Sequence, residues 1–192
     1  MVSLGGVKTG SHEWTFDYRP KEVVRHVITS GVIPDDKSTQ FYPTPPEICE
    51  YVLSVASIKD GQTMLEPSAG TGAMISEIEG DVKITAIELT KHRCVALESV
   101  GKYEVINSDF LKYQTDRKFD RIVMNPPFSE GRAVMHVEHA YSMLSDGGKL
   151  VAVVPMGFKT DLKYEKLKQF DNCFHNTGIS VMVIKMEKLQ WK

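Results

Sequence analysis

The sequence lacks the features that mark several classes of protein. Its three cysteines are scattered and form no C-x-x-C pair, so neither a disulfide framework nor a zinc site is indicated. The formal net charge is −2, so no basic excess points to a nucleic-acid partner by itself. We therefore interpret the cysteines as reduced thiols in a core and give them no chemical role.

Long apolar runs and low-complexity tracts are also missing. No apolar run reaches the roughly 20 residues that a membrane helix needs, and the N-terminus lacks the pattern of a secretory signal. We therefore expect a cytoplasmic protein without a membrane partner. With 192 residues, 42% hydrophobic and 25% charged, the chain matches one globular domain with a short appendage, and not a disordered protein.

What the sequence does contain is an alternation of short apolar strands and helical segments. Strands are predicted at 63–67, 83–88, 103–107, 119–124 and 149–155, and helical spacing occurs at 91–99 and 130–145. This order predicts an α/β fold with a doubly wound, mostly parallel sheet, which binds ligands beyond the carboxyl ends of its strands. Apolar runs on both sides of Asn176, Thr177 and Gly178 predict an antiparallel C-terminal hairpin at the sheet edge.

The residues before the sheet form a separate unit in this interpretation. The segment "PKEVVRHVITSG" predicts a helix at 20–30 that starts at Pro20 and stops at Gly31. Pro34 to Gln40 resembles a linker. We therefore divide the chain into an N-terminal arm, residues 1–40, and a larger domain, residues 41–192.

Two strand ends favour a nucleoside site. Gly70 and Gly72 in "PSAGTG" allow a sharp turn and close ligand approach, and we expect a helix after Gly72. A lone G-x-G also suits a plain tight turn, and Ile75 stands where a dinucleotide fingerprint has a small residue, which argues against NAD. The next strand ends at Glu88, whose carboxylate can accept hydrogen bonds from both ribose hydroxyls. The order and distance of these elements favour nucleoside binding over a solvated strand end.

Polar residues near two other segments extend this site. Asp109 can accept the amino group of an adenine with Phe110 against the ring, although Asp109 alone would also suit a turn. Thr44, Pro45 and Glu47 have capping-box spacing at the start of a helix predicted at 45–57. The Thr44 hydroxyl and the helix N-terminus can also meet a carboxylate.

The segment "FDRIVMNPPFSEG" carries chemistry that suits an amino-group acceptor. An amino group on a conjugated ring is a poor nucleophile, because its lone pair is delocalised. The Asn125 side-chain oxygen and the Pro126 carbonyl can accept its two hydrogens and localise that lone pair. Pro126 and Pro127 fix the backbone, and Phe128 offers a flat face worth about 1 to 3 kcal/mol for stacking a base. A rigid turn with a core-packed phenylalanine is the alternative.

Taken in order, these motifs resemble the gamma class of amino-group DNA methyltransferases, which are Rossmann-like, S-adenosylmethionine-dependent enzymes that make N6-methyladenine. The resemblance spans residues 41 to about 185 and rests on the T-P-P, E-P-x-x-G-x-G, acidic, D-F and N-P-P-[YF] segments. It implies a Rossmann-like class I methyltransferase fold, S-adenosyl-L-methionine as cofactor, and no metal. The implied catalytic residues are Asn125, Pro126, Pro127 and Phe128; the implied cofactor-binding residues are Thr44, Glu66, Pro67, Ser68, Ala69, Gly70, Gly72, Glu88, Asp109 and Phe110. Phe128 and Phe174 would hold the base, although Phe174 suits a hairpin core equally well.

The resemblance implies adenine in DNA as the substrate. Enzymes of this class usually carry a separate target-recognition domain, so we expect a minimal enzyme whose recognition comes from a partner subunit or a second copy. An RNA base and the side-chain amide of protein glutamine are alternative acceptors, because related N-P-P loops serve them. A non-catalytic methyltransferase-like partner subunit is a further alternative.

Two groups of side chains are given no role in the site. His136 and His139 are interpreted as helix-surface histidines, because no third metal ligand accompanies them. Lys159, Lys163, Lys166 and Lys168 alternate with acidic residues, which is typical of a solvated helix.

Overall fold

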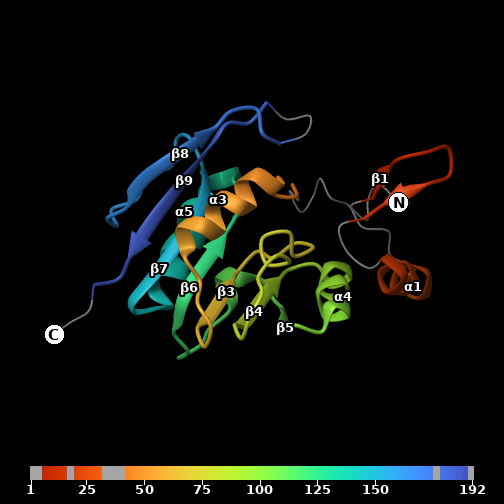
Figure 1. The fold of residues 1–192 in the computed structure, drawn as a ribbon, viewed down its shortest axis with the longest axis horizontal. Coiled ribbons are helices and arrows are strands. Elements are labelled where there is room, and N and C mark those ends of the chain that lie inside the picture. Colours follow the sequence, from red (N-terminus) through yellow and green to blue (C-terminus); the bar gives the residue numbers. More distant parts are fainter. Residues whose placement is uncertain (1–5, 17–19, 32–41, 175–177, 190–192) are drawn as a thin grey trace.

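The computed structural model describes residues 6–16, 20–31, 42–174 and 178–189. Its centre is a seven-stranded sheet in the order β5-β4-β3-β6-β7-β9-β8 (Figure 1). The strands are β3 (Thr63–Glu66), β4 (Lys83–Glu88), β5 (Tyr103–Asn107), β6 (Phe119–Met124), β7 (Leu144–Pro155), β8 (Glu165–Phe170) and β9 (Val181–Glu187). The β5-β4-β3-β6-β7 part is parallel, and β9 runs antiparallel to both β7 and β8. The predicted fold class is therefore confirmed.

Helices cover both faces of this sheet. Successive side chains of a strand point to opposite faces, so apolar side chains on both faces can pack against helices. The helices are α1 (Pro20–Ser30), α3 (Pro46–Ala56), α4 (Lys91–Val100) and α5 (Arg132–Ser142). Met64 of β3 packs in one apolar cluster with residues of α3, whereas the next residue, Leu65, packs in a second cluster with residues of α5. Figure 1 shows α3 in front of the sheet. Each buried strand thus contributes to two separate cores.

The N-terminal region contributes a small hairpin and one helix. Strands β1 (Val7–Lys8) and β2 (Trp14–Thr15) pair antiparallel. Helix α1 has the predicted bounds and packs against α4, where Val23 contacts the cluster that contains Ala96. The predicted linker, Pro34 to Gln40, lies outside the described residues.

Two predicted helices differ in the structure: one does not form, and the other begins later than predicted. No helix follows Gly72: Gly70 (φ 56°) and Gly72 (φ 91°) are left-handed, and residues 70–77 form turns before the chain enters β4. Helix α5 begins only at Arg132, since Glu130 (φ 54°) and Gly131 (φ 72°) interrupt the helical backbone. Short 3₁₀ turns lie at Phe110–Lys112 and Ser129–Gly131.

The lysine-rich segment does not form the predicted helix. Lys166 and Lys168 belong to β8, the edge strand that pairs with β9. The pairing shifts register between Lys166 and Gln169, and both Leu167 and Phe170 pack in the α3-side cluster. Burial of these two side chains favours a strand, and lysines on an edge strand discourage pairing with other chains.

The C-terminal hairpin forms, but its first strand lies earlier than predicted. Strand β8 ends at Phe170, whereas the prediction began the hairpin after that point. Of the expected turn residues, Asn176 and Thr177 lie outside the described residues. Within the described ranges, no helix combines the length and apolar character that crossing a bilayer requires.

Candidate active site

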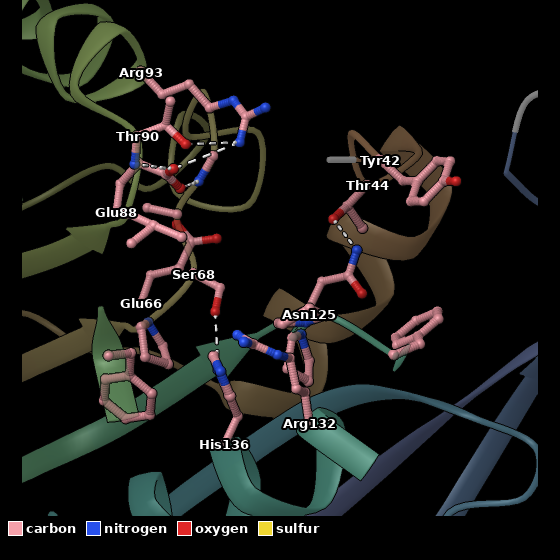
Figure 2. Close-up of a pocket in the computed structure, with 18 of the residues that line it drawn as sticks. Tyr42, Thr44, Glu66, Ser68, Glu88, Thr90, Arg93, Asn125, Arg132 and His136 are labelled. Atoms are coloured by element: carbon pink, nitrogen blue, oxygen red, sulfur yellow. Dashed lines mark hydrogen bonds and ion pairs between the residues drawn. The ribbon is translucent and has the colours of Figure 1, made fainter. Parts of the chain in front are cut away.

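A cavity of about 630 Å³ lies at the carboxyl ends of β3, β4, β5 and β6 (Figure 2). The order of the strands reverses between β3 and β6, which is where doubly wound sheets bind ligands. The sequence-predicted residues that line it are Thr44, Glu66, Pro67, Ser68, Ala69, Gly70, Glu88, Asp109, Phe110, Asn125, Pro126, Pro127, Phe128 and Phe174. Residues from six segments of the chain therefore meet in one place.

Gly72 is the predicted site residue that does not line the cavity. Its φ is 91°, and a Cβ atom there would approach Leu97 Cδ2 of α4 to 2.9 Å. The role of Gly72 is therefore to form the turn and to allow close packing against α4, and not to line the ligand cavity.

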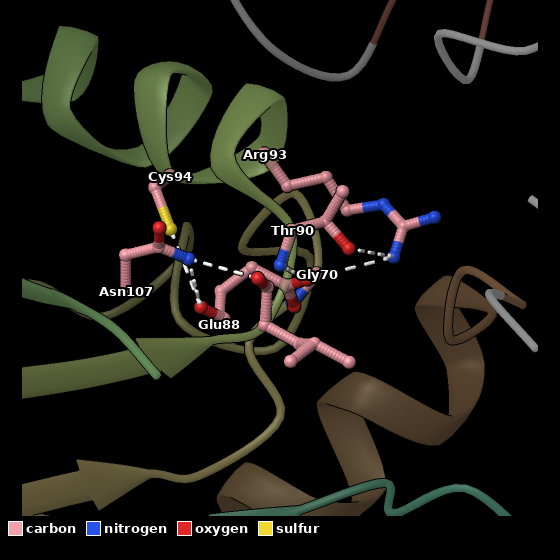
Figure 3. Close-up of polar contacts among 7 residues, drawn as sticks. Gly70, Glu88, Thr90, Arg93, Cys94 and Asn107 are labelled. Carbon is pink, nitrogen blue, oxygen red and sulfur yellow. Dashed lines mark hydrogen bonds and ion pairs between the residues drawn. The ribbon is translucent and has the colours of Figure 1, made fainter. Parts of the chain in front are cut away.

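Glu88 organises the glycine loop from the end of β4. Its side chain is buried, with 6% of the residue exposed. As Figure 3 shows, Oε2 accepts the Gly70 N–H at 2.9 Å and Oε1 accepts the Thr90 N–H at 2.8 Å. The buried Arg93 guanidinium lies 3.5 Å from Oε1 and balances the charge. A carboxylate has about four acceptor positions, so Glu88 keeps capacity for a ligand while it holds the loop.

Glu66 lies beside Glu88 without comparable support. The residue is 3% exposed, and among the residues that the structure describes its Oε2 has no hydrogen-bond partner. Burial, and then repulsion from Glu88, raise the pKa of Glu66 well above its ordinary value. Because a nearby cation would reverse this effect, the site is suited to a positively charged ligand.

Asn125 follows β6 and is oriented by a residue far away in the sequence. Its Nδ2 donates to the Thr44 hydroxyl at 3.0 Å (Figure 2). Its Oδ1 is buried and has no partner in the described part of the chain. The Thr44 contact therefore turns the amide so that an acceptor oxygen is left for a ligand.

The predicted capping box at Thr44 is not formed. The N-cap is Pro45, in an extended conformation with φ −58° and ψ 145°, and no side chain caps the helix. The residue before a proline avoids the helical region, so Pro46 forces the helix to begin one residue later than the T-x-x-E pattern requires. A proline does occupy the first turn, but it is Pro46, because Pro45 is the N-cap.

Aromatic rings border the cavity on the Asn125 side. The Phe128 and Phe174 ring centroids lie 6.2 Å apart at 81°, and the Tyr42 and Phe174 centroids lie 6.4 Å apart at 68°. Phe174 is a buried member of the α3-side core, as one interpretation expected, and it also lines the cavity; its role in holding a base stays a prediction. Tyr42 lines the cavity too and was missed, because an exposed tyrosine before a proline carries no distinctive pattern.

The prediction of a surface position for His136 is wrong. His136 is 5% exposed, lines the cavity, and places Nδ1 3.3 Å from the Ser68 hydroxyl. The burial of His136 could have been predicted from its helical spacing with Ala133, Val137 and Ala140, which form the buried face of α5. His139 is partly buried and bonds the Tyr113 carbonyl through Nε2 at 3.0 Å. No metal-binding group of side chains occurs in the described ranges.

Comparison with known proteins identifies the family of this fold and site. A family model described as "Methyltransferase small domain" matches residues 70–182, which is more than half of the 192-residue chain. The chain belongs to this family. The matched region begins at the glycine loop, includes the N-P-P-F segment, and ends in β9.

Individual relatives match at modest identity. The chain is 29% identical over 111 residues to a type II methyltransferase, M.CvrRI, of Paramecium bursaria Chlorella virus XZ-6E (49% of this chain, 29% of the relative). It is 26% identical over 135 residues to a tRNA (guanine(10)-N2)-dimethyltransferase of Methanothermobacter thermautotrophicus (60% of this chain, 40% of the relative). It therefore spans less than half the length of either relative.

Solved structures show the same fold. A dimethyladenosine transferase from Plasmodium falciparum superposes with a TM-score of 0.62 at 16% identity, covering 77% of this chain and 64% of that chain. TrmN from Thermus thermophilus superposes with a TM-score of 0.55 at 19% identity, covering 75% of this chain and 49% of that chain. The fold is that of class I methyltransferases.

The family and the fold imply S-adenosyl-L-methionine as the cofactor, and the residues present fit it. The cofactor carries a sulfonium and an ammonium group, and the unpartnered Glu66 Oε2 offers a buried acceptor for positive charge. The loop at Gly70 lines the cavity and brings its backbone to a ligand without a side chain in between. The cavity has nonpolar walls as well, from Phe110 and Met74.

We expect the raised pKa of Glu66 to make stability depend on pH in a way that Glu66→Gln removes. The folded protein keeps this proton at pH values where the unfolded chain releases it, so the contribution of Glu66 to stability falls as pH rises above about 4.3. Glutamine has no such proton. Between pH 5 and 8 the free energy of unfolding of Glu66→Gln should therefore rise relative to wild type.

Urea denaturation of both proteins at the two pH values measures this difference. Glu79→Gln is the matched control, because Glu79 is an exposed glutamate in the following turn. A difference between Glu66→Gln and wild type that is the same at pH 5 and pH 8 would show that Glu66 ionises normally in the fold.

Proposed function

We propose that the protein transfers a methyl group from S-adenosyl-L-methionine to the N6 amino group of adenine in DNA. The observation that carries this proposal is the Asn125 side chain. Its Oδ1 is buried and unpartnered among the described residues, while its Nδ2 is held by the Thr44 hydroxyl at 3.0 Å. The Glu66 and Glu88 carboxylates border the same cavity.

The Asn125 loop would activate the amino group by accepting a hydrogen bond from each of its two N–H groups. Oδ1 of Asn125 accepts one hydrogen and the backbone carbonyl of Pro126 accepts the other, so the nitrogen lone pair is drawn out of the ring. Thr44 keeps the amide from rotating, and the two prolines hold the carbonyl in place. The bound cofactor supplies an electrophilic methyl group on its sulfonium. Positioning then accounts for most of the acceleration.

The other lining residues divide between the two ligands. On the cofactor side we assign Glu66 to Gly70 to the amino-acid part, Glu88 to the ribose, and Asp109 with Phe110 to the adenine. Asp109 is already held in place, because its Oδ1 accepts the Leu111 N–H at 3.1 Å. On the substrate side, Phe128 provides the stacking face and Phe174 packs edge-on against it.

DNA is favoured as the polymer by the resemblance to amino-group DNA methyltransferases and by the relative named as a type II methyltransferase. The relative that modifies guanine N2 in tRNA shares an exocyclic amino nitrogen as its acceptor, which supports the acceptor chemistry. An RNA base is therefore the second candidate. Protein glutamine and a non-catalytic partner role remain further alternatives, with less to support them.

The division of the chain also remains a proposal. We assign catalysis to residues 41–192 and treat residues 1–40 as an arm whose helix α1 packs against α4. We further propose that target recognition comes from a partner subunit or a second copy.

Incubation with radiolabelled donor and separate pools of DNA, RNA and protein tests the proposed substrate. We expect label in DNA, recovered after digestion as N6-methyladenine, and none in heat-inactivated controls. Sequencing that detects modified adenines, applied to cells expressing the protein, should then show a recurrent site. Label confined to RNA would favour the second candidate, and label confined to protein would refute the adenine assignment.

A further inference from the structure

His136 is a buried polar side chain in the cavity for which the proposed function provides no role. It lies on α5, and its side chain extends toward Ser68 in the loop after β3 (Figure 2). The Ser68 hydroxyl lies 3.3 Å from Nδ1. Nε2 is buried and has no partner in the part of the chain that the structure describes. A buried, unpaired ring nitrogen is costly, so a ligand that pairs with it would gain affinity.

The His136 imidazole is neutral at physiological pH. Burial, and then the nearby Arg132 guanidinium, lower its pKa to about 4, while Asp109 opposes this effect and His139 adds to it. A neutral imidazole carries one N–H and one free lone pair. With Nδ1 engaged by Ser68, Nε2 is left to donate or accept one hydrogen bond with a ligand.

Two contacts of His136 place it on the cofactor side of the cavity. Ser68 follows the strand that ends in Glu66, and the His136 ring lies 5.4 Å from the Phe110 ring, which follows β5. The contact with Phe110 places His136 beside the residues assigned to the cofactor's adenine, whose polar edge is the ligand group within reach in the proposed arrangement.

We infer that His136 binds the adenine edge of S-adenosyl-L-methionine through Nε2, with Ser68 holding the ring in place. This inference rests on the proposed division of the cavity between cofactor and substrate. It adds a cofactor contact from α5 to those from the strand ends. It also explains why a polar side chain occupies the buried face of a helix.

Two substitutions separate the two ring nitrogens. Glutamine places a polar atom near the position of Nε2, whereas asparagine places one near Nδ1 and so keeps only the Ser68 contact. We expect His136→Asn to weaken the binding of S-adenosylhomocysteine about tenfold and His136→Gln to weaken it less than about threefold. Isothermal titration calorimetry of the full chain at pH 7.5 measures both, alongside the thermal midpoint of each variant.

His139→Gln is the matched control. His139 lies one turn further along α5 and also packs against Phe110, at 4.7 Å between ring centroids, but it bonds the Tyr113 carbonyl and does not line the cavity. Its substitution should lower the thermal midpoint without the loss of affinity. In NMR spectra of the imidazole nitrogens of wild type, S-adenosylhomocysteine should shift Nε2 of His136 more than Nδ1.

The outcomes distinguish this inference from the proposed function. If wild type binds no S-adenosylhomocysteine, the proposed function itself fails. If wild type binds it and His136→Asn binds equally well, only the role of His136 is overturned. Unchanged cofactor affinity together with a raised KM for DNA would place His136 on the substrate side instead, and would also overturn the inference.

Discussion

Replacing Asn125 with alanine should reduce the rate of methyl transfer by a factor on the order of a thousand, as for loss of a preorganised polar group in other active sites. The Asn125 Oδ1 is buried and unpartnered in the described structure, and in the proposed function it accepts a hydrogen bond from the substrate amino group. Without it, the acceptor nitrogen keeps its delocalised lone pair. Cofactor affinity should stay within about threefold of wild type, because Glu66 and Glu88 remain. Single-turnover transfer and calorimetry measure the two quantities separately.

Substitutions at Thr44 provide the control for this prediction. Thr44→Val removes the hydroxyl that accepts from Asn125 Nδ2 at 3.0 Å but keeps the shape of the side chain. We expect a drop in transfer rate of about tenfold, since the amide can then rotate. Thr44→Ser keeps the hydroxyl and should restore most of the rate. If Asn125→Ala transfers methyl groups at the wild-type rate, hydrogen bonding of the amino group to Asn125 Oδ1 and the Pro126 carbonyl does not account for catalysis.

Replacing Glu88 with alanine should weaken cofactor binding at least about a hundredfold and destabilise the fold by about 3 kcal/mol. The substitution removes the acceptor of two backbone N–H groups, those of Gly70 and Thr90, and leaves the buried Arg93 guanidinium without its carboxylate. The glycine loop would lose its attachment to β4. Urea denaturation and calorimetry with S-adenosylhomocysteine provide the two measurements.

Arg93→Met is the matched variant for Glu88→Ala. It also breaks the ion pair, but it leaves the carboxylate bonded to the Gly70 and Thr90 N–H groups. We expect a comparable loss of stability and a much smaller loss of cofactor affinity. If both variants lose affinity equally, Glu88 acts only through the fold and makes no contact with the ribose. The double variant would measure the coupling energy of the pair.

Several errors in the sequence-based predictions have a common cause. Residues that match a local pattern interact instead with residues that are distant in the sequence. The T-x-x-E pattern at Thr44 suited a helix cap, but the Thr44 hydroxyl bonds Asn125 instead. The lysine-rich segment suited a solvated helix, but β9 offered an unpaired edge and the core accepted Leu167 and Phe170. His136 resembled a surface residue only while the cavity beside α5 was unknown.

The sequence by itself determined the strands of the parallel sheet, the order of the motifs, and the strand ends at which the cavity lies. It could do so because apolar alternation is local, and because parallel strands bring their carboxyl ends to one edge of the sheet. Only the tertiary structure decided which side chains meet there, such as Thr44 and Asn125, which are 81 residues apart. The same holds for Ser68 and His136, which are 68 apart. Hydrogen bonds at such separations depend on how the layers pack, and no local pattern in the chain records that packing.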